Sequence, residues 1–152
     1  MILEREAIDL ISAALRHVRD AEWLAESTHP GGSPDQAWHL AGYGPECARK
    51  ATLRIRAFDK TIGHRFGSGR ENVLDVALAL DPFALRYAPS DWAGRYPALT
   101  EWREDVRYER TGSFARKPLP VGELVLHSRR AVDAVVAALW ADGRFPDLEL
   151  PW

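Results

Sequence analysis

The chain has 152 residues, of which 46% are hydrophobic and 28% are charged, and its formal net charge is −2. These values are ordinary for a globular domain with a hydrophobic core, and they exclude a disordered chain and a strongly basic nucleic-acid-binding protein. No apolar run approaches the roughly 18 residues that span a bilayer, and the N-terminus lacks a basic region followed by an apolar one. The single cysteine excludes an internal disulfide. We therefore expect one domain over residues 1–152, located in the cytoplasm, with no membrane partner.

Residues 3–26 form the first predicted helix. Their apolar side chains recur at three- and four-residue steps without an intervening proline or glycine, as in a helix with one buried face. The next six residues, 27–32, contain one proline and two glycines and predict a turn. Because this turn is short, we expect the second helix to lie antiparallel beside the first.

The second helix, over residues 33–60, is predicted to be the central one. Ser33 is its N-terminal cap, a proline occupies the first helical position, and Gln36 completes a capping box. Small residues line its apolar side, so other helices can approach closely. Pro45 lacks an amide hydrogen and crowds the preceding turn, so we expect a kink near residues 41–44.

The second half of the chain mixes helices with irregular structure. A capping box of Ser68 and Glu71 precedes the apolar residues of a short predicted helix over residues 73–80, which ends before Pro82. From 82 to 120, five prolines and many aromatic residues predict irregular structure, with two or three helical turns within 98–110. Residues 121–139 predict a long last helix with a broad apolar face, ended by a cap at Gly143. The sequence therefore predicts an all-α fold with an irregular segment before the last helix.

Two stretches carry a resemblance to a known family. The second helix contains Ala-Trp-His-Leu-Ala-Gly-Tyr at residues 37–43, followed by Glu46, Cys47 and Lys50, and residues 102–108 read Trp-Arg-Glu-Asp-Val-Arg-Tyr. This arrangement resembles HEPN (higher eukaryote and prokaryote nucleotide-binding) domains. The resemblance implies an antiparallel bundle of four or five helices that forms a homodimer. It also implies a toxin–antitoxin or phage-defence setting, with a nucleotidyltransferase as partner.

Many HEPN proteins are metal-independent ribonucleases. Their motif is an arginine, four to six intervening residues and a histidine near the last helix, which supply a cation for the phosphate and a proton acceptor. In this chain no histidine has an arginine at that spacing; Gly122, Val121 and Pro120 occupy the positions five, six and seven residues before His127. No residue inherits a catalytic role. We therefore expect a protein that binds RNA, a nucleotide or a protein partner without a cofactor, or a purely structural dimer.

Glu46 lies on or beside the buried side of the second helix. A buried carboxylate needs a partner because its desolvation is costly, and we predict an ion pair with Arg107. In one interpretation, this pair anchors the irregular segment to the bundle. In the other, the pair belongs to a ligand pocket. The pocket would be lined by His39, Tyr43, Glu46, Arg107 and Tyr108.

Residues 49–70 form the most basic part of the chain. They include seven basic residues and one acidic residue, a net charge of +6 against about −8 in the remainder. Arg49, Arg56 and Lys60 share one helical face, and Lys50 lies beside them. Two interpretations remain open: a solvated face, or a face that binds phosphate groups or an acidic partner.

A metal site is the enzymatic alternative. His17, His39 and His127 each lie on one of the three long predicted helices, where they could serve as ligands. Trp-His-Leu-Ala at residues 38–41 resembles the second-helix histidine of DinB-like metal proteins. Those proteins also have a His-x-x-x-His pair, whereas Ala131 stands four residues after His127. The preferred interpretation is therefore a HEPN-like bundle without a metal.

Overall fold

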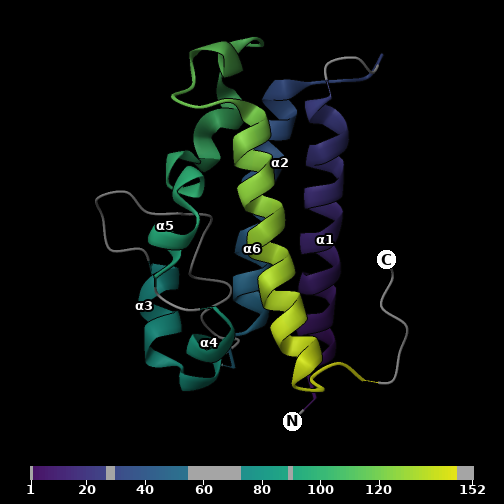
Figure 1. Cartoon of the computed structure of the whole chain (residues 1–152), viewed down its shortest axis with the longest axis vertical. Helices are drawn as coiled ribbons and strands as arrows, with labels where there is room; N and C mark the ends of the chain where they lie inside the picture. The colour runs from purple at the N-terminus through teal and green to yellow at the C-terminus, as the bar shows by residue number, and fades with distance from the viewer. Residues whose placement is uncertain (1, 27–29, 55–72, 89–90, 147–152) are drawn as a thin grey trace.

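The computed structural model describes residues 2–26, 30–54, 73–88 and 91–146. All regular secondary structure within these ranges is helical (Figure 1). The prediction of an all-α helical bundle is confirmed. No helix in the described ranges is long and apolar enough to cross a membrane.

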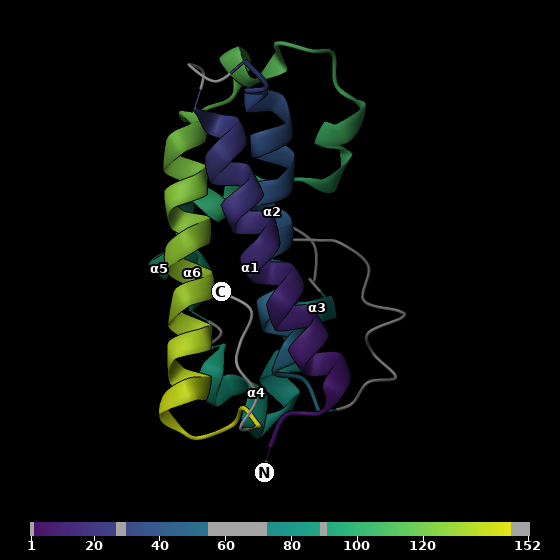
Figure 2. The same cartoon turned by 90° about the vertical axis from the view of Figure 1, so that its right-hand side faces the viewer.

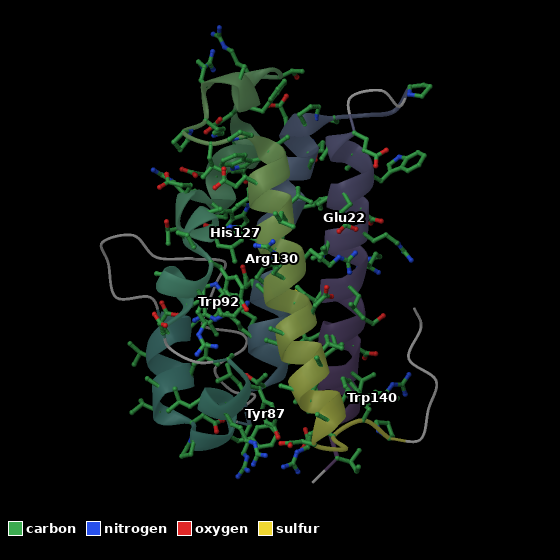
Figure 3. All side chains as sticks on the ribbon, in the orientation of Figure 1. Glu22, Tyr87, Trp92, His127, Arg130 and Trp140 are labelled. Atoms are coloured by element: carbon green, nitrogen blue, oxygen red, sulfur yellow. The ribbon has the colours of Figure 1, made fainter. Side chains whose placement is uncertain are left out.

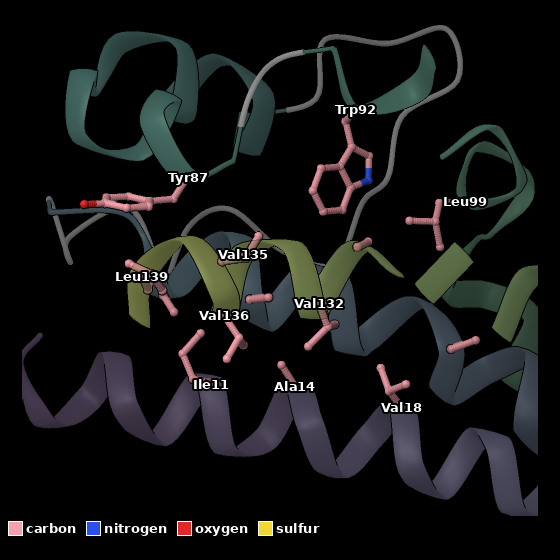
Figure 4. Packing of buried hydrophobic residues seen from close by; sticks show 14 of the residues in the cluster. Ile11, Ala14, Val18, Tyr87, Trp92, Leu99, Val132, Val135, Val136 and Leu139 are labelled. Carbon is pink, nitrogen blue, oxygen red and sulfur yellow. The ribbon is translucent and has the colours of Figure 1, made fainter. Parts of the chain in front are cut away.

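Three long helices form the body of the fold: α1 (Arg5–Ala25), α2 (Pro34–Ala51) and α6 (Val121–Ala141). They lie side by side in both views (Figures 1 and 2). Their buried faces are mainly apolar, and the hydrophobic core lies between them. Figure 4 shows this core, in which residues of α1 face residues of α6. The α1 residues are Ile11, Ala14 and Val18, and the α6 residues are Val132, Val136 and Leu139.

The predicted hairpin of α1 and α2 is present. The Ser33 amide donates to the Leu24 carbonyl oxygen at 2.9 Å, which closes the turn between the helices. Ser33 Oγ accepts from the Gln36 amide at 3.4 Å, as expected for an N-terminal cap. Gly44 allows the two helices to approach closely, because an added Cβ would lie 2.5 Å from Val18 Cγ2. A small residue at this position is therefore required by packing.

The backbone of α2 remains helical across Pro45 and ends at Ala51. There the amide and the hydroxyl of Thr52 both donate to the Arg49 carbonyl oxygen, at 3.1 and 2.7 Å. The helix is therefore shorter than the predicted range. Residues 55–60 of that range lie outside the described residues.

The last long helix, α6, is joined to both other long helices by polar contacts. Ser128 Oγ donates to the Ala41 carbonyl oxygen of α2 at 2.6 Å. The Arg129 guanidinium binds both oxygens of Glu22 on α1, at 2.8 and 2.6 Å. Gly143 has a φ of +61°, which confirms the predicted glycine cap beyond the end of the helix.

Short helices fill the segment between α2 and α6 and lie on the side away from α1 (Figure 1). Residues 73–80 form the predicted helix, whose predicted capping box lies outside the described residues, but residues 98–110 form two short 3-10 helices separated at Trp102. Trp102 has an extended backbone and a fully buried ring, so burial of the ring interrupts the predicted helix. The short elements are α3 (Val73–Leu80), α4 (Pro82–Tyr87), α5 (Trp92–Arg95), η2 (Pro97–Glu101), η3 (Glu104–Tyr108) and η4 (Ser113–Arg116).

Candidate functional site

The predicted polar cluster is centred on Tyr43 of α2. Its ring centroid lies 4.8 Å from that of His39, 5.3 Å from that of Trp102 and 5.8 Å from that of His17. Trp102 Nε1 donates to the His39 carbonyl oxygen at 3.0 Å. The indole fits beside Gly42, where an added Cβ would lie 2.0 Å from it. The structure thus brings His39 and Tyr43 together and adds His17 and Trp102, which sequence reasoning had not placed in this cluster.

The imidazole of His17 is half-buried between α1 and α2. Burial is the largest influence and lowers the pKa of His17 below its ordinary value. Arg16 lowers this pKa further, and Asp20 opposes the shift. His17 is therefore mainly neutral at pH 7.

The three histidines of the metal alternative do not form a ligand set. Within the part of the chain that the structure describes, no three His, Cys, Asp or Glu side chains are grouped to hold a metal ion. His17 and His39 pack against Tyr43. His127 instead accepts a hydrogen bond at Nδ1 from the Ala98 amide at 3.3 Å, on the side of α6 that contacts η2 (Figure 3). The metal alternative is therefore wrong, because these helices turn their histidines toward different neighbours.

Glu46 is buried, with 2% of its surface exposed, as predicted for a residue that needs a cationic partner. Lys50, one helical turn later, places Nζ 2.8 Å from Glu46 Oε1. The side chain of Arg107 lies outside the described residues, so the ion pair of Glu46 with Arg107 stays a prediction. The observed partner of Glu46 is therefore Lys50, a residue that the sequence had placed on the basic face.

Arg49 is also buried, with 1% of its surface exposed. Its guanidinium forms an ion pair with Asp75 of α3 and lies 4.7 Å from the ring centroid of Trp92 on α5. Burial has the largest effect and lowers the pKa of Arg49, while Asp75 opposes this shift. Arg49 therefore holds α3 and α5 to the central helix through charge and ring contacts.

The predicted basic face is wrong for Arg49 and Lys50. Both side chains are in the interior, and α3 and α5 cover the side of α2 that carries Arg49. The periodicity of α2 identifies residues that share a face, but distant segments determine which face is covered. Arg56 and Lys60, the other members of this prediction, lie outside the described residues.

A segment that we call the arm, residues 103–117, extends from the bundle beside the start of α2 (Figures 1 and 2). Asp35 in the first turn of α2 holds it in place. The Asp35 carboxylate accepts hydrogen bonds from the Gly112 amide at 2.6 Å, the Phe114 amide at 2.9 Å and Ser113 Oγ at 3.1 Å. Burial alone would raise the pKa of Asp35, but these hydrogen bonds outweigh it and lower the pKa.

A second contact fixes the far end of the arm. Lys117 Nζ lies 2.6 Å from Glu109 Oε2 and 5.7 Å from the ring centroid of Trp38 on α2. The hydrogen bond from Lys117 is the largest influence on the pKa of Glu109 and lowers it. Asp35 and Trp38 therefore attach the arm to α2 at two points.

The outer surface of the arm presents aromatic and cationic side chains. Tyr108 is 76% exposed, so it does not line an enclosed pocket with the buried Glu46, and Phe114 is 36% exposed. Arg110 and Arg116 are exposed, and the ion pairs among the described residues include neither of them. Of these four exposed residues, sequence reasoning had identified only Tyr108; Arg107, the other predicted site residue in the arm, has a side chain outside the described residues. The signal that this reasoning missed is the mixture of aromatic and arginine residues across this segment.

No protein-family model, curated protein or solved structure matches the chain.

Proposed function

We propose that the protein binds single-stranded RNA through the arm and does not cleave it. Tyr108 and Phe114 expose ring surfaces on which bases can stack. Base stacking on an aromatic side chain contributes about 1–3 kcal/mol per base and tolerates any sequence. Arg110 and Arg116 belong to the same exposed segment and can contact phosphates. The observation that carries the proposal is this exposed combination of aromatic rings with guanidinium groups that form no ion pair among the described residues.

The attachment of the arm supports the same function. Asp35 holds the backbone at Gly112 and Phe114, and Lys117 pairs with Glu109, the residue after Tyr108. A ligand therefore binds a segment that is already ordered, and the conformational entropy lost on binding is reduced. The arm acts as a preorganised stacking surface.

The resemblance to HEPN domains favours RNA as the ligand and a nucleotidyltransferase as a further partner. The proposal assigns no catalytic residue, because no histidine of the chain has an arginine at the spacing of the family's ribonuclease motif. A protein of this kind differs from a ribonuclease in one measurable respect: the RNA that it binds stays uncleaved.

Fluorescence anisotropy with a labelled oligouridine of about 12 nucleotides tests this function. We expect saturable binding, intact RNA after incubation, and an affinity that falls with salt. If both arginines contact phosphate, the plot of log K against log salt concentration should have a slope of about −1.4. Replacing Tyr108 and Phe114 together with alanine should weaken binding about tenfold or more, because two stacking surfaces are lost.

Matched control variants test whether RNA binds at the arm or elsewhere on the surface. Trp23→Ala and Leu80→Ala remove exposed apolar side chains outside the arm and should leave RNA affinity unchanged. Arg110→Gln with Arg116→Gln should flatten the salt dependence, whereas Arg19→Gln on α1 should not. Equal affinity of the parent and both arm variants would overturn the proposal. RNA cleavage would refute its noncatalytic part.

We also propose that the chain forms a homodimer through the outer face of α6. Leu126 is 45% exposed and Trp140 is 58% exposed on this helix, and Arg130 points outward between them (Figure 3). An antiparallel pair of α6 helices, with its two-fold axis between Arg130 and Asp133, would place each Arg130 against Asp133 of the partner subunit. The same register would place Leu126 against the partner's Ala137, a large side chain against a small one.

A charge exchange tests this dimer. Light scattering should give a dimer for the parent and a monomer for Arg130→Glu, because like charges would then oppose each other. Adding Asp133→Arg to Arg130→Glu should restore the dimer, since opposite charges again face each other across the axis. A monomeric parent, or a double variant that stays monomeric while Arg130→Glu dissociates, would contradict this interface.

A further inference from the structure

A cavity of about 260 Å³ is lined by N-terminal residues, the end of α2 and the start of α4. These elements lie at the same end of the bundle (Figures 1 and 2). Apart from Glu4 and Arg54, its lining side chains are apolar. The arm lies near the opposite end of α2, so this cavity is separate from the proposed RNA-binding surface. The apolar lining is formed by Ile2, Leu3, Ala51, Leu53 and Phe83.

Hydrogen bonds hold the walls of the cavity. The Leu3 amide donates to the Arg144 carbonyl oxygen at 2.7 Å, which fixes the N-terminal wall. One oxygen of Asp81 accepts from the Arg54 amide at 2.8 Å, and the other accepts from the Phe83 amide at 2.9 Å. Asp81 therefore joins the end of α2 to the start of α4. The space is built into the fold, as ligand pockets usually are.

Arg54 supplies a cation at this cavity. Its guanidinium carbon lies 4.7 Å from the ring centroid of Phe83, while its backbone is held by Asp81. The side chain is exposed, and the ion pairs among the described residues do not include it. Arg144 also lies over this ring, at 5.5 Å, but its guanidinium donates to the Tyr87 hydroxyl at 2.8 Å. Arg54 thus supplies the cation of the lining, and its guanidinium lies over Phe83, another lining residue.

We propose that this cavity binds a small carboxylate with an apolar body, such as a medium-chain fatty acid. The hydrocarbon occupies the apolar space, and the carboxylate binds the guanidinium of Arg54, a geometry that allows two parallel hydrogen bonds. A cavity of about 150 Å³ is large enough for benzene, so a cavity of about 260 Å³ can hold a larger hydrocarbon group, such as a medium-length alkyl chain. Glu4 adds a negative charge to the lining, which selects a monoanion over a phosphate or a dicarboxylate.

Isothermal titration of the full chain with octanoate tests the proposal. We expect saturable binding with one site, and weaker binding of octanol, which has the same chain length but no charge. Arg54→Met keeps an apolar stem over Phe83 and should weaken octanoate binding about tenfold while leaving octanol binding unchanged, because only the charged contact is lost. Arg19→Met on α1 is the matched control and should bind octanoate like the parent, since its side chain is 65% exposed and lies outside the lining.

Two further variants test the place and the chemistry of the site. Ala51→Leu adds volume inside the cavity and should reduce the affinity for both octanoate and octanol. Glu4→Gln removes a negative charge and should tighten octanoate binding. Weaker octanoate binding in Glu4→Gln would contradict the repulsion between Glu4 and the bound carboxylate, and would overturn the proposed position of the carboxylate. No saturable binding of octanoate up to about 5 mM, or equal affinity in the parent and Arg54→Met, would overturn the proposal.

Discussion

Ser128 on α6 donates a hydrogen bond to the carbonyl oxygen of Ala41 on α2 at 2.6 Å. In a regular helix this carbonyl accepts from the amide four residues later, but that residue is Pro45, which has no amide hydrogen. Both Ser128 and Ala41 are fully buried, so water cannot replace the missing donor. The hydroxyl of Ser128 therefore satisfies the acceptor that the internal proline leaves without its helical partner.

We expect Ser128→Ala to lower the free energy of unfolding by about 1–3 kcal/mol, because it leaves this buried carbonyl unsatisfied. Urea denaturation measures the change. In a Pro45→Ala background an amide is available at position 45, so the same serine substitution should cost less. An equal cost in the two backgrounds would show that Ser128 does not compensate for the proline.

Gly42 and Gly122 form a matched pair for the packing of Trp102. An added Cβ at Gly42 would lie 2.0 Å from the Trp102 ring, whereas at Gly122 on α6 no atom lies within 4 Å. Gly42→Ala should therefore destabilise the protein by about 1–3 kcal/mol or more through overpacking. Gly122→Ala should be neutral or stabilise by up to about 1 kcal/mol through helix propensity. Thermal and urea unfolding of both variants check these signs.

The buried pair of Glu46 and Lys50 should contribute much more than an exposed pair of the same spacing. Glu46→Ala leaves buried cations without this carboxylate and should cost about 3–5 kcal/mol. Asp91→Ala removes a partner of Arg95 from a pair of the same i,i+4 spacing in which both side chains are more than half exposed, and should cost under about 1 kcal/mol. Urea denaturation compares the two variants. Similar losses of unfolding free energy in the two variants would contradict the larger contribution expected of the buried pair.

A double-mutant cycle between Glu46 and Arg107 tests the ion pair predicted from the sequence. A coupling free energy above about 1 kcal/mol, measured from the urea denaturation of the two single variants and the double variant, supports direct contact. Additive effects would reject the pair and leave Lys50 as the partner of Glu46.

The attachment of the arm should depend on pH through Asp35. Because the folded pKa of Asp35 is lowered, its contribution to stability is fully present above the unfolded pKa of about 3.9 and is lost as pH falls through the folded value. Hydrogen exchange of the Gly112 and Phe114 amides, corrected for the intrinsic rate, should therefore become faster below about pH 4.

Asp35→Asn supplies the control for this prediction. It cannot be ionised and has one acceptor oxygen instead of two, so the protection of the Gly112 and Phe114 amides should be weaker at neutral pH and should not change with acidification. Trypsin should cleave after Arg110 or Arg116 faster in this variant than in the parent, since one of these two backbone amides loses its acceptor. Unchanged protection in Asp35→Asn would exclude Asp35 as the group that holds the arm.

Sequence patterns predicted the candidate site only in part. His39, Tyr43 and Glu46 were identified because they belong to one helix whose spacing is readable. Trp102 was known only as part of a motif, and its insertion beside Gly42 depends on how the segment before α6 folds back. The anchoring role of Asp35 was not predicted, because its partners lie more than 70 residues later in the chain.

The sequence by itself determined the all-α class, the start of α2 at Ser33 and the glycine cap at Gly143, because apolar spacing and capping are local properties of the backbone. Only the tertiary structure decided which charged side chains are buried. Arg49 and Lys50 occur in a basic stretch typical of an exposed face, yet both are in the interior, where Arg49 contacts Asp75 of α3 and Trp92 of α5. Burial depends on segments distant in the sequence, and helical periodicity contains no information about which segments cover a given face.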